Sequence, residues 1–200
     1  MLGVGPGIGF KIPPIVENAE FSSSIKYVQD GDIRIEENVP DGSYIESKGG
    51  SVEIVGSVGN GVFIISFKNM NIRGSVGIGA RLEANGGMKV EGDIASRCSL
   101  LAIHLISASN ISDGCSLISK EGRIVVRDVG NAVYFEALKE RVATYRLGDE
   151  VEIHAGGDVV INGPEPEFII VIQPPEAFTF LKNGLKMHKG GLNKVRAAAD

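Results

Sequence analysis

The sequence has little of what secreted and membrane proteins are built from. It contains no tryptophan and only two cysteines, and no apolar run approaches the roughly 18 residues of a transmembrane helix. The cysteines, Cys98 and Cys115, make no disulfide framework, which favours a reducing compartment. The stretch MLGVGPGIGFKIPP at the N-terminus has neither a basic region nor a long apolar segment, so no signal peptide is expected. We therefore expect a cytoplasmic protein without a transmembrane segment.

An excess of basic charge is missing as well. The net charge is −5 at pH 7, so no nucleic acid partner and no general affinity for anionic membranes are expected. Hydrophobic residues make up 43% of the chain, which excludes a disordered polar tract, and 200 residues suffice for one domain with a core. Glycine is what the chain has in excess, with 27 residues, about twice the usual share.

A nine-residue motif recurs seven times along the chain. It reads aliphatic, small or turn residue, two variable positions, small, any, large apolar, any, then Ser or Ala, as in VGNGVFIIS and VGIGARLEA. The copies start 17 to 19 residues apart, at Val39, Val58, Val76, Ile94, Ile111, Val129 and Leu147. A period this short and regular indicates a solenoid, because one unit buries its apolar face only against neighbouring copies.

The second half of each unit predicts a short strand. Apolar pairs two residues apart, such as Val52 with Ile54 and Met70 with Ile72, recur there. Gly-Gly pairs precede several of them, at 49–50, 86–87 and 156–157, where we expect glycine to supply the positive φ of tight corners. Short strands separated by corners in an 18-residue unit predict an all-β fold, a single-stranded parallel β-helix of about seven coils stacked about 4.8 Å apart.

Equivalent residues of successive coils are then expected to form three inward ladders. The central ladder is large and apolar, with Ile45, Ile64, Leu82, Leu100, Leu117, Phe135 and Ile153. One flanking ladder is smaller, with Ser43, Val62, Ala80, Cys98, Cys115, Val133 and Val151. The other is smaller still, with Ser47, Ser66, Ala84, Ala102, Ser119, Ala137 and Ala155.

The stretch YFEALKERVATYRL, residues 134–147, favours a helix by residue propensity alone. The repeat runs through it, since Phe135 and Ile153 are again 18 residues apart, so strands are predicted, with a short inserted helix as the alternative. The expected organisation is an N-terminal cap over 1–24, the β-helix over 25–163, a C-terminal cap strand within 164–181, and a basic tail, mobile or helical, over 182–200.

The stretches GARLEANGGMKVEGDI (79–94) and EVEIHAGGDVVINGP (150–164) resemble the glycine-rich coils of the flagellar assembly protein A family of bacteria. The resemblance covers about residues 30–165 and implies a right-handed coil and a role in flagellar or cell-envelope-associated assembly. The chain departs from that family, whose N-terminal α/β portion and long C-terminal helical segment have no room in these residues. A second resemblance, to the bactofilins, rests on coil length and short flanks and implies a self-polymerising structural protein.

No pattern in the sequence predicts catalytic residues, a cofactor or a metal ion. The histidines, His104, His154 and His188, fall in different phases of the repeat, so a shared metal site is not expected. The stretch GVGPGIG at 3–9 lacks the Lys-Ser/Thr of a P-loop and the spacing of a dinucleotide-binding loop. Apolar residues at every sixth position over 52–106 leave one enzymatic alternative, since hexapeptide acyltransferases also have 18-residue coils. Those coils are left-handed, and the enzymes need a catalytic histidine in a subunit cleft.

The remaining hypothesis is a rigid scaffold for protein–protein interaction or assembly. Strand alternation directs a set of apolar residues of the middle coils outward, where polar residues are usual. We expect this face to contact a protein partner or a second copy of the chain, or to be covered by residues 168–181. The acids Glu36, Glu37 and Asp41 are expected to be ordinary corner residues. The candidate interaction face consists of Phe63, Ile65, Phe67, Leu101, Ile103 and Ile118.

Overall fold

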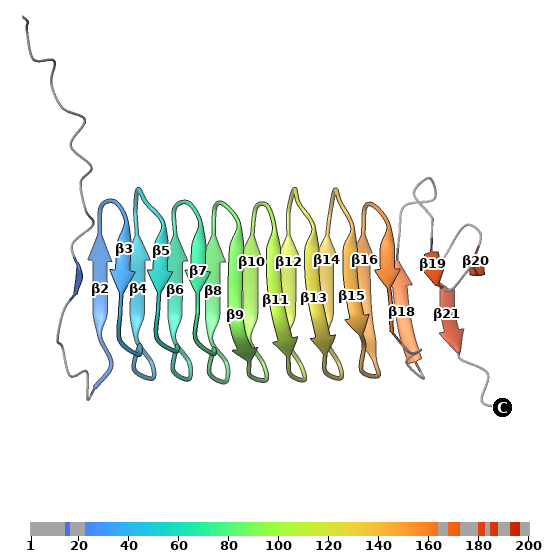
Figure 1. Ribbon diagram of the computed structural model, residues 1–200, viewed down its shortest axis with the longest axis horizontal. Helices are drawn as coiled ribbons and strands as arrows, with labels where there is room; N and C mark the ends of the chain where they lie inside the picture. Colours follow the sequence, from blue (N-terminus) through green and yellow to red (C-terminus); the bar gives the residue numbers. More distant parts are fainter. Residues whose placement is uncertain are drawn as a thin grey trace, which may run out of the picture.

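The chain forms a rod of stacked coils built from two facing parallel sheets (Figure 1). The computed structural model describes residues 15–16, 23–163, 168–172, 180–182, 185–187 and 193–196. It confirms the predicted β-solenoid, with about eight turns of about 18 residues rather than about seven. None of the described residues is helical, so no helix that could cross a membrane occurs among them.

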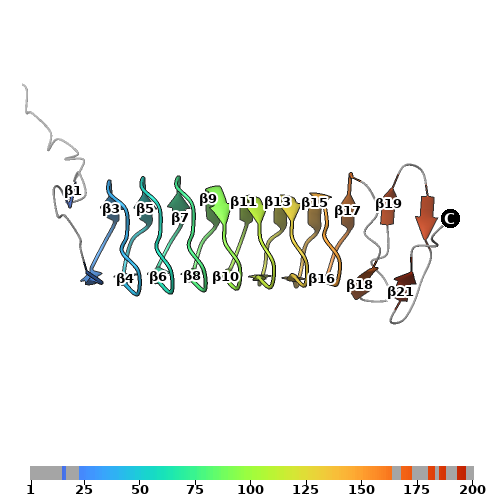
Figure 2. The ribbon, with the colours of Figure 1, turned by 90° about the horizontal axis from the view of Figure 1, so that it is seen from below.

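The coil is right-handed. As the coils advance from left to right in Figure 1, the strands of the nearer sheet run downward and those of the farther sheet run upward. Figure 2, seen from below, separates the two sheets and shows which of them is nearer in the first view. This handedness is the one that parallel crossover connections almost always adopt, because of the right-handed twist of the strands.

Two sheets hold all of the described strands. Sheet A contains β1 (Ile15–Val16), β3 (Ile33–Ile35), β5 (Val52–Ile54), β7 (Met70–Ile72), β9 (Met88–Ile94), β11 (Ile106–Ile111), β13 (Ile124–Val129), β15 (Val142–Arg146), β17 (Val159–Ile161), β19 (Phe180–Lys182) and β20 (Leu185–Met187). Sheet B contains β2 (Lys26–Gln29), β4 (Tyr44–Ser47), β6 (Phe63–Ser66), β8 (Arg81–Ala84), β10 (Ser99–Ala102), β12 (Ser116–Ser119), β14 (Tyr134–Ala137), β16 (Val151–Ala155), β18 (Phe168–Ile172) and β21 (Asn193–Arg196).

The interior consists of the predicted ladders. In the central ladder Ile64 pairs in register with Ile45 on one side and Leu82 on the other, and the pairing continues to Ile153. Every member of the three ladders is buried. The apolar pairs of the second half of the unit face them from sheet A, where Val52 pairs with Met70 and Met70 with Met88. Aliphatic side chains from both sheets therefore fill one continuous, narrow core.

The stretch 134–147 is not helical. It forms β14 and β15 with a turn between them, and Phe135 is fully buried between Leu117 and Ile153 of the neighbouring coils. Burial of the alternate residues outweighs the helix propensity of this stretch, and the intervening LKER (138–141) provides the exposed turn. The helical alternative is therefore wrong.

The last strands change direction at the C-terminal end of the stack. β18 pairs in parallel with β16, and β19 with β17, so both add a rung to their sheets. β21 then pairs antiparallel with β18, and β20 antiparallel with β19. Most of the predicted N-terminal cap and much of the basic tail lie outside the described residues.

The Gly-Gly pairs serve close approach between coils rather than positive φ, which corrects the expectation from sequence. None of them is among the residues with positive φ. A Cβ built on Gly50 would lie 2.2 Å from the carbonyl carbon of Gly31 in the preceding coil, and one on Gly156 would lie 2.2 Å from the oxygen of Leu138. No side chain fits at Gly50 or Gly156, because the backbones of consecutive coils touch there, whereas a Cβ on Gly49 would be 3.6 Å from its nearest atom.

Positive φ instead occurs at the fourth position of the repeat motif, which the sequence pattern leaves variable. Gly61 and Gly79 adopt left-handed φ values of 60° and 68° at this position, with no neighbour within 4 Å of a Cβ built there. Three coils place a residue with a side chain in the same conformation, which is unfavourable for L-amino acids. These residues are Arg97 (φ 63°), Ala132 (φ 52°) and Glu150 (φ 59°).

Stacked side-chain caps satisfy the backbone of the neighbouring turn. Asp41 Oδ1 accepts a hydrogen bond from the backbone N–H of Asn60 at 2.7 Å, and Asn60 Oδ1 accepts one from Ile78 at 2.8 Å. Asp113 and Asn131 repeat this arrangement further along the rod. Asp41 is therefore more than an ordinary corner residue, because it links two coils.

Candidate interaction face

The six predicted face residues point away from the core of sheet B or lie just beyond its strands. Ile65, Leu101 and Ile118 share one outward position of β6, β10 and β12, between buried inward neighbours. Phe63 occupies the other outward position of β6, and Phe67 and Ile103 follow their strands directly. Strand alternation thus brings the set to one side of the rod, as expected.

The face is divided into two parts by a charged rung. Ile65 lies in register with Glu46 on one side and Glu83 on the other, so it has no aliphatic neighbour in its row. Leu101 also pairs with Glu83, and on its other side it pairs with Ile118. Leu101 and Ile118 therefore form a contiguous aliphatic pair, while Ile65 is separated from them by β8.

The charged rung also covers the aromatic part of the face. The Arg81 guanidinium lies 5.1 Å from the centroid of the Phe63 ring and forms an ion pair with Glu83 at 2.5 Å. Tyr44 contacts the other side of Phe63 edge-on, with ring centroids 5.5 Å apart. Five of the six face residues are half-buried: Phe63, Ile65, Leu101, Ile103 and Ile118. Phe67 is the one member with a large exposed area, at 52%.

The chain's own C-terminal strands do not cross this face. β18 and β19 extend the two sheets edge to edge beyond β16 and β17, at the end of the rod. Residues 173–179, the remainder of the segment expected as an intramolecular cover, lie outside the described residues. The outward side chains of β6, β10 and β12 are thus not covered by any described strand.

The two histidines among the described residues, His104 and His154, follow or lie on strands three coils apart and do not come together. His154 points outward from β16, with Nε2 2.6 Å from Glu152 Oε1 and its ring 5.1 Å from that of Tyr134. Burial of the Tyr134 hydroxyl, together with its hydrogen bond to Glu136, raises the pKa of Tyr134 to about 12. His104 lies exposed beyond β10, and His188 lies outside the described residues. Among residues 23–163 no group of three His, Cys, Asp or Glu side chains is placed to hold a metal ion.

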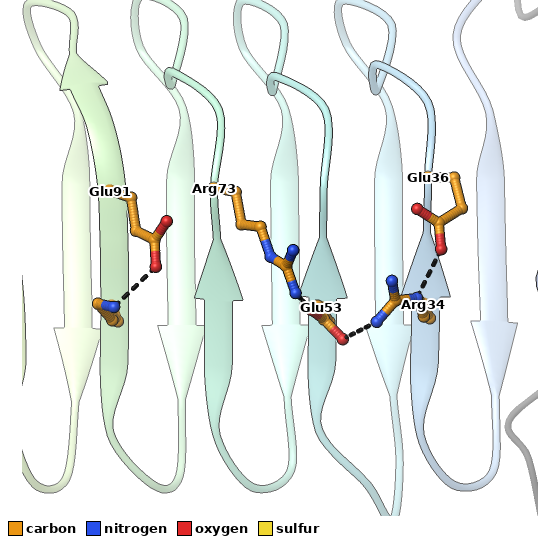
Figure 3. A network of polar contacts seen from close by, with 6 residues as sticks. Arg34, Glu36, Glu53, Arg73 and Glu91 are labelled. Carbon is orange, nitrogen blue, oxygen red and sulfur yellow. Dashed lines mark hydrogen bonds and ion pairs between the residues drawn. The ribbon is translucent and has the colours of Figure 1, made fainter.

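A charge network on the outward side of sheet A was not predicted from the sequence (Figure 3). Arg34 bonds Glu36 of its own coil and Glu53 of the next, and Arg73 approaches the other oxygen of Glu53, each at 2.6 Å. One coil after Arg73, Lys89 pairs with Glu91 at 2.7 Å. The signal in the sequence is charges of alternating sign about one repeat apart, since Arg34 precedes Glu53 by 19 residues and Glu53 precedes Arg73 by 20.

The network changes the ionisation of its members. The hydrogen bond from Lys89 lowers the pKa of the Glu91 carboxyl, and the hydrogen bond with Glu36 raises the pKa of Arg34. Because these groups are exposed, water and salt screen the pairs, and each pair contributes little to stability. Glu36, expected to be an ordinary corner residue, is thus the terminal member of an ion-pair chain across three coils.

A shallow depression of about 470 Å³ lies where β11 and β13 turn toward the next corner. The charge of Asp128 in its lining is compensated by Arg146, also in the lining, at 3.0 Å and by the neighbouring Arg127 at 2.9 Å. Asn110 joins them, donating to Asp93 and accepting from Arg127. This arrangement ties four coils together and contains no nucleophile paired with a base.

Comparison with protein-family models found no match. Comparisons with curated proteins and with solved structures found none either. The resemblances to flagellar assembly protein A and to the bactofilins remain predictions.

Proposed function

We propose that the chain is a non-catalytic, rigid β-solenoid scaffold for protein–protein interaction or assembly, of the kind found in flagellar and cell-envelope assembly proteins. The observation that carries the proposal is the outward side of sheet B, where half-buried aliphatic and aromatic side chains stand in place of polar ones on three of the middle coils. Isolated exposed apolar residues need no explanation, but Leu101 beside Ile118, with Ile103 next to them, forms a contiguous group.

Rigidity is the second support for the proposal. Each described coil from β4 to β16 is hydrogen-bonded to the coil before and the coil after it in both sheets. Corner side chains add bonds between coils, as Asp41 does with Asn60. A rod held at every corner keeps its surface residues at constant spacing, which suits a docking surface.

Two alternatives have less support. A bactofilin-like polymer would extend its parallel coils from one subunit to the next, whereas here antiparallel β20 and β21 follow the last parallel strands. An acyltransferase of the hexapeptide type would have left-handed coils, whereas these are right-handed (Figures 1 and 2). Electron microscopy and sedimentation over a range of concentrations separate a filament from a discrete scaffold.

The experiment that tests the scaffold proposal compares two faces of the rod. Ile65→Lys with Ile118→Lys places charge on sheet B, and Val55→Lys with Val125→Lys makes the same chemical change on half-buried outward residues of sheet A. Tagged wild type and both variants are cross-linked in the native cell, and the attached proteins are quantified. We expect the sheet B variant to lose at least tenfold of a specific attachment that the sheet A variant keeps. Equal attachment to all three proteins would contradict the proposal.

A further inference from the structure

Cys98 and Cys115 are the chain's two cysteines, and they lie side by side inside the solenoid. The strands that follow them pair in register, Ser99 with Ser116, and the Ser116 amide donates to the Cys98 carbonyl at 2.9 Å. Both side chains point inward in the same ladder, and each is 1% exposed. Both are free thiols, and each donates to a backbone carbonyl of the preceding coil, Cys98 Sγ to Gly77 O at 3.1 Å and Cys115 Sγ to Ala95 O at 3.2 Å.

This placement meets the backbone requirement of a disulfide. In-register neighbours in a parallel sheet have Cα atoms about 4.8 Å apart, and disulfides span Cα separations of about 4.4 to 6.8 Å. The side chains leave adjacent coils in the same inward direction, so the two sulfurs are neighbours in one ladder. We infer that Cys98 and Cys115 form an oxidative modification site, at which a peroxide joins consecutive coils by a disulfide.

The reaction needs no reagent beyond the peroxide. The Cys98 thiolate attacks one oxygen of hydrogen peroxide, the O–O bond breaks, and Cys98 becomes a sulfenic acid as hydroxide leaves. The Cys115 sulfur then attacks the Cys98 sulfur, the S–S bond forms, and the S–O bond breaks to release a second hydroxide. The two thiol protons join the two hydroxides, so two thiols and one peroxide become one disulfide and two waters.

The environment of the pair favours Cys98 as the sulfur that reacts first. The neighbouring Cys115 thiol lowers the pKa of the Cys98 thiol, whereas the Cys98 thiol and burial raise the pKa of Cys115. The thiolate is the reactive form, so the lower pKa directs the oxidant to Cys98. Cys115 then acts as the resolving thiol from the same ladder position of the next coil.

A small oxidant has a short way to the pair. Cys98 directly follows Arg97, and Cys115 directly follows Gly114, and both preceding residues are exposed in the turn that leads into sheet B. Opening of one turn uncovers the sulfurs without separating the strands. Hydrogen peroxide is therefore the reagent of choice.

The test exposes the full chain to hydrogen peroxide in buffer, and to the same dose in urea that unfolds it. Trypsin then releases residues 98–120 as one peptide with both cysteines, and a second cleavage before Asp113 divides it between them. We expect the native chain to lose both free thiols and two hydrogen atoms of mass, and to stay monomeric. The two fragments should remain joined until they are reduced.

The single variants Cys98→Ser and Cys115→Ser are the controls, since Ser43 shows that the ladder accepts a buried hydroxyl. Each should gain oxygen on the remaining sulfur and show no joined fragments. Three results for the native wild type would each overturn the inference. They are oxygen adducts without joined fragments, disulfide-linked dimers, and retention of both thiols at a dose that oxidises the unfolded chain.

Discussion

Cys98 and Cys115 lie in register on consecutive coils, both buried in the same inward ladder. They are 17 residues apart, whereas most coils repeat at 18, so the intervening coil is one residue shorter. A shift of one residue in a strand turns its inward side chains to the other face. The one-residue difference arises at an irregularity in the β9–β11 pairing, where the offset changes from 18 (Met88 with Ile106) to 17 (Ile94 with Ile111), so Ser99 still pairs in register with Ser116.

The left-handed turn position predicts a stabilising substitution. Ala132 is exposed with φ 52°, where glycine is favoured by roughly 1 to 2 kcal/mol. Ala132→Gly should therefore raise the free energy of unfolding by about 0.5 to 1 kcal/mol, after the extra freedom of glycine in the unfolded chain is subtracted. Urea unfolding measures the difference, with Ala132→Ser as a control that keeps a Cβ. A loss of stability in the glycine variant would show that φ is not the determining term.

Two neighbouring glycines predict opposite tolerance to the same change. A Cβ on Gly50 would lie 2.2 Å from the Gly31 carbonyl carbon, whereas one on Gly49 would meet its nearest atom, the Gly31 nitrogen, at 3.6 Å. Gly50→Ala should destabilise the fold by about 2 kcal/mol or more, because the coils must move apart. Gly49→Ala should change stability by less than about 0.5 kcal/mol. Thermal and urea unfolding of both variants test this, and similar losses would contradict the assigned contact.

The inward and outward sides of β8 predict a second contrast. Leu82 is fully buried, and Leu82→Asp should prevent folding, because a carboxylate would lie without a partner among aliphatic side chains. Glu83, one residue on, points outward and pairs with Arg81. Glu83→Gln should lower stability by at most about 1 kcal/mol. Circular dichroism and soluble yield distinguish the two variants, and a folded Leu82→Asp protein would refute the inward ladder.

Asp41 predicts a defined acid response. The backbone N–H of Asn60 lowers the pKa of the Asp41 carboxyl in the folded chain. Its contribution to stability is therefore complete above the unfolded-state pKa of about 3.9 and is lost as the pH falls through the lower folded-state value. Asp41→Asn keeps the acceptor, as Asn60 does at the equivalent position, so it should flatten the loss of stability below about pH 4. Urea unfolding between neutral and acidic pH tests this, and an unchanged pH profile would count against Asp41.

The period of the sequence determined which residues meet between coils. In a solenoid, residues one repeat apart are neighbours, so the order Ile45, Ile64, Leu82 in the chain became their order in the sheet. The same rule assigned the outward direction of Ile65 and Leu101, which alternation along a strand dictates. It also overrode helix propensity at residues 134–147, because Phe135 could be buried only in phase.

Tertiary structure decided what depends on distances between coils and on side-chain direction. The corner glycines have no distinguishing neighbour in sequence, and only the contact of Gly50 with Gly31 separates close approach from positive φ. The division of the candidate face by Arg81 and Glu83 arises because long charged side chains of one rung reach over the ring of the next. The network from Glu36 to Arg73 likewise joins opposite charges about one repeat apart. These charges pair because the strands bring them onto one outward face.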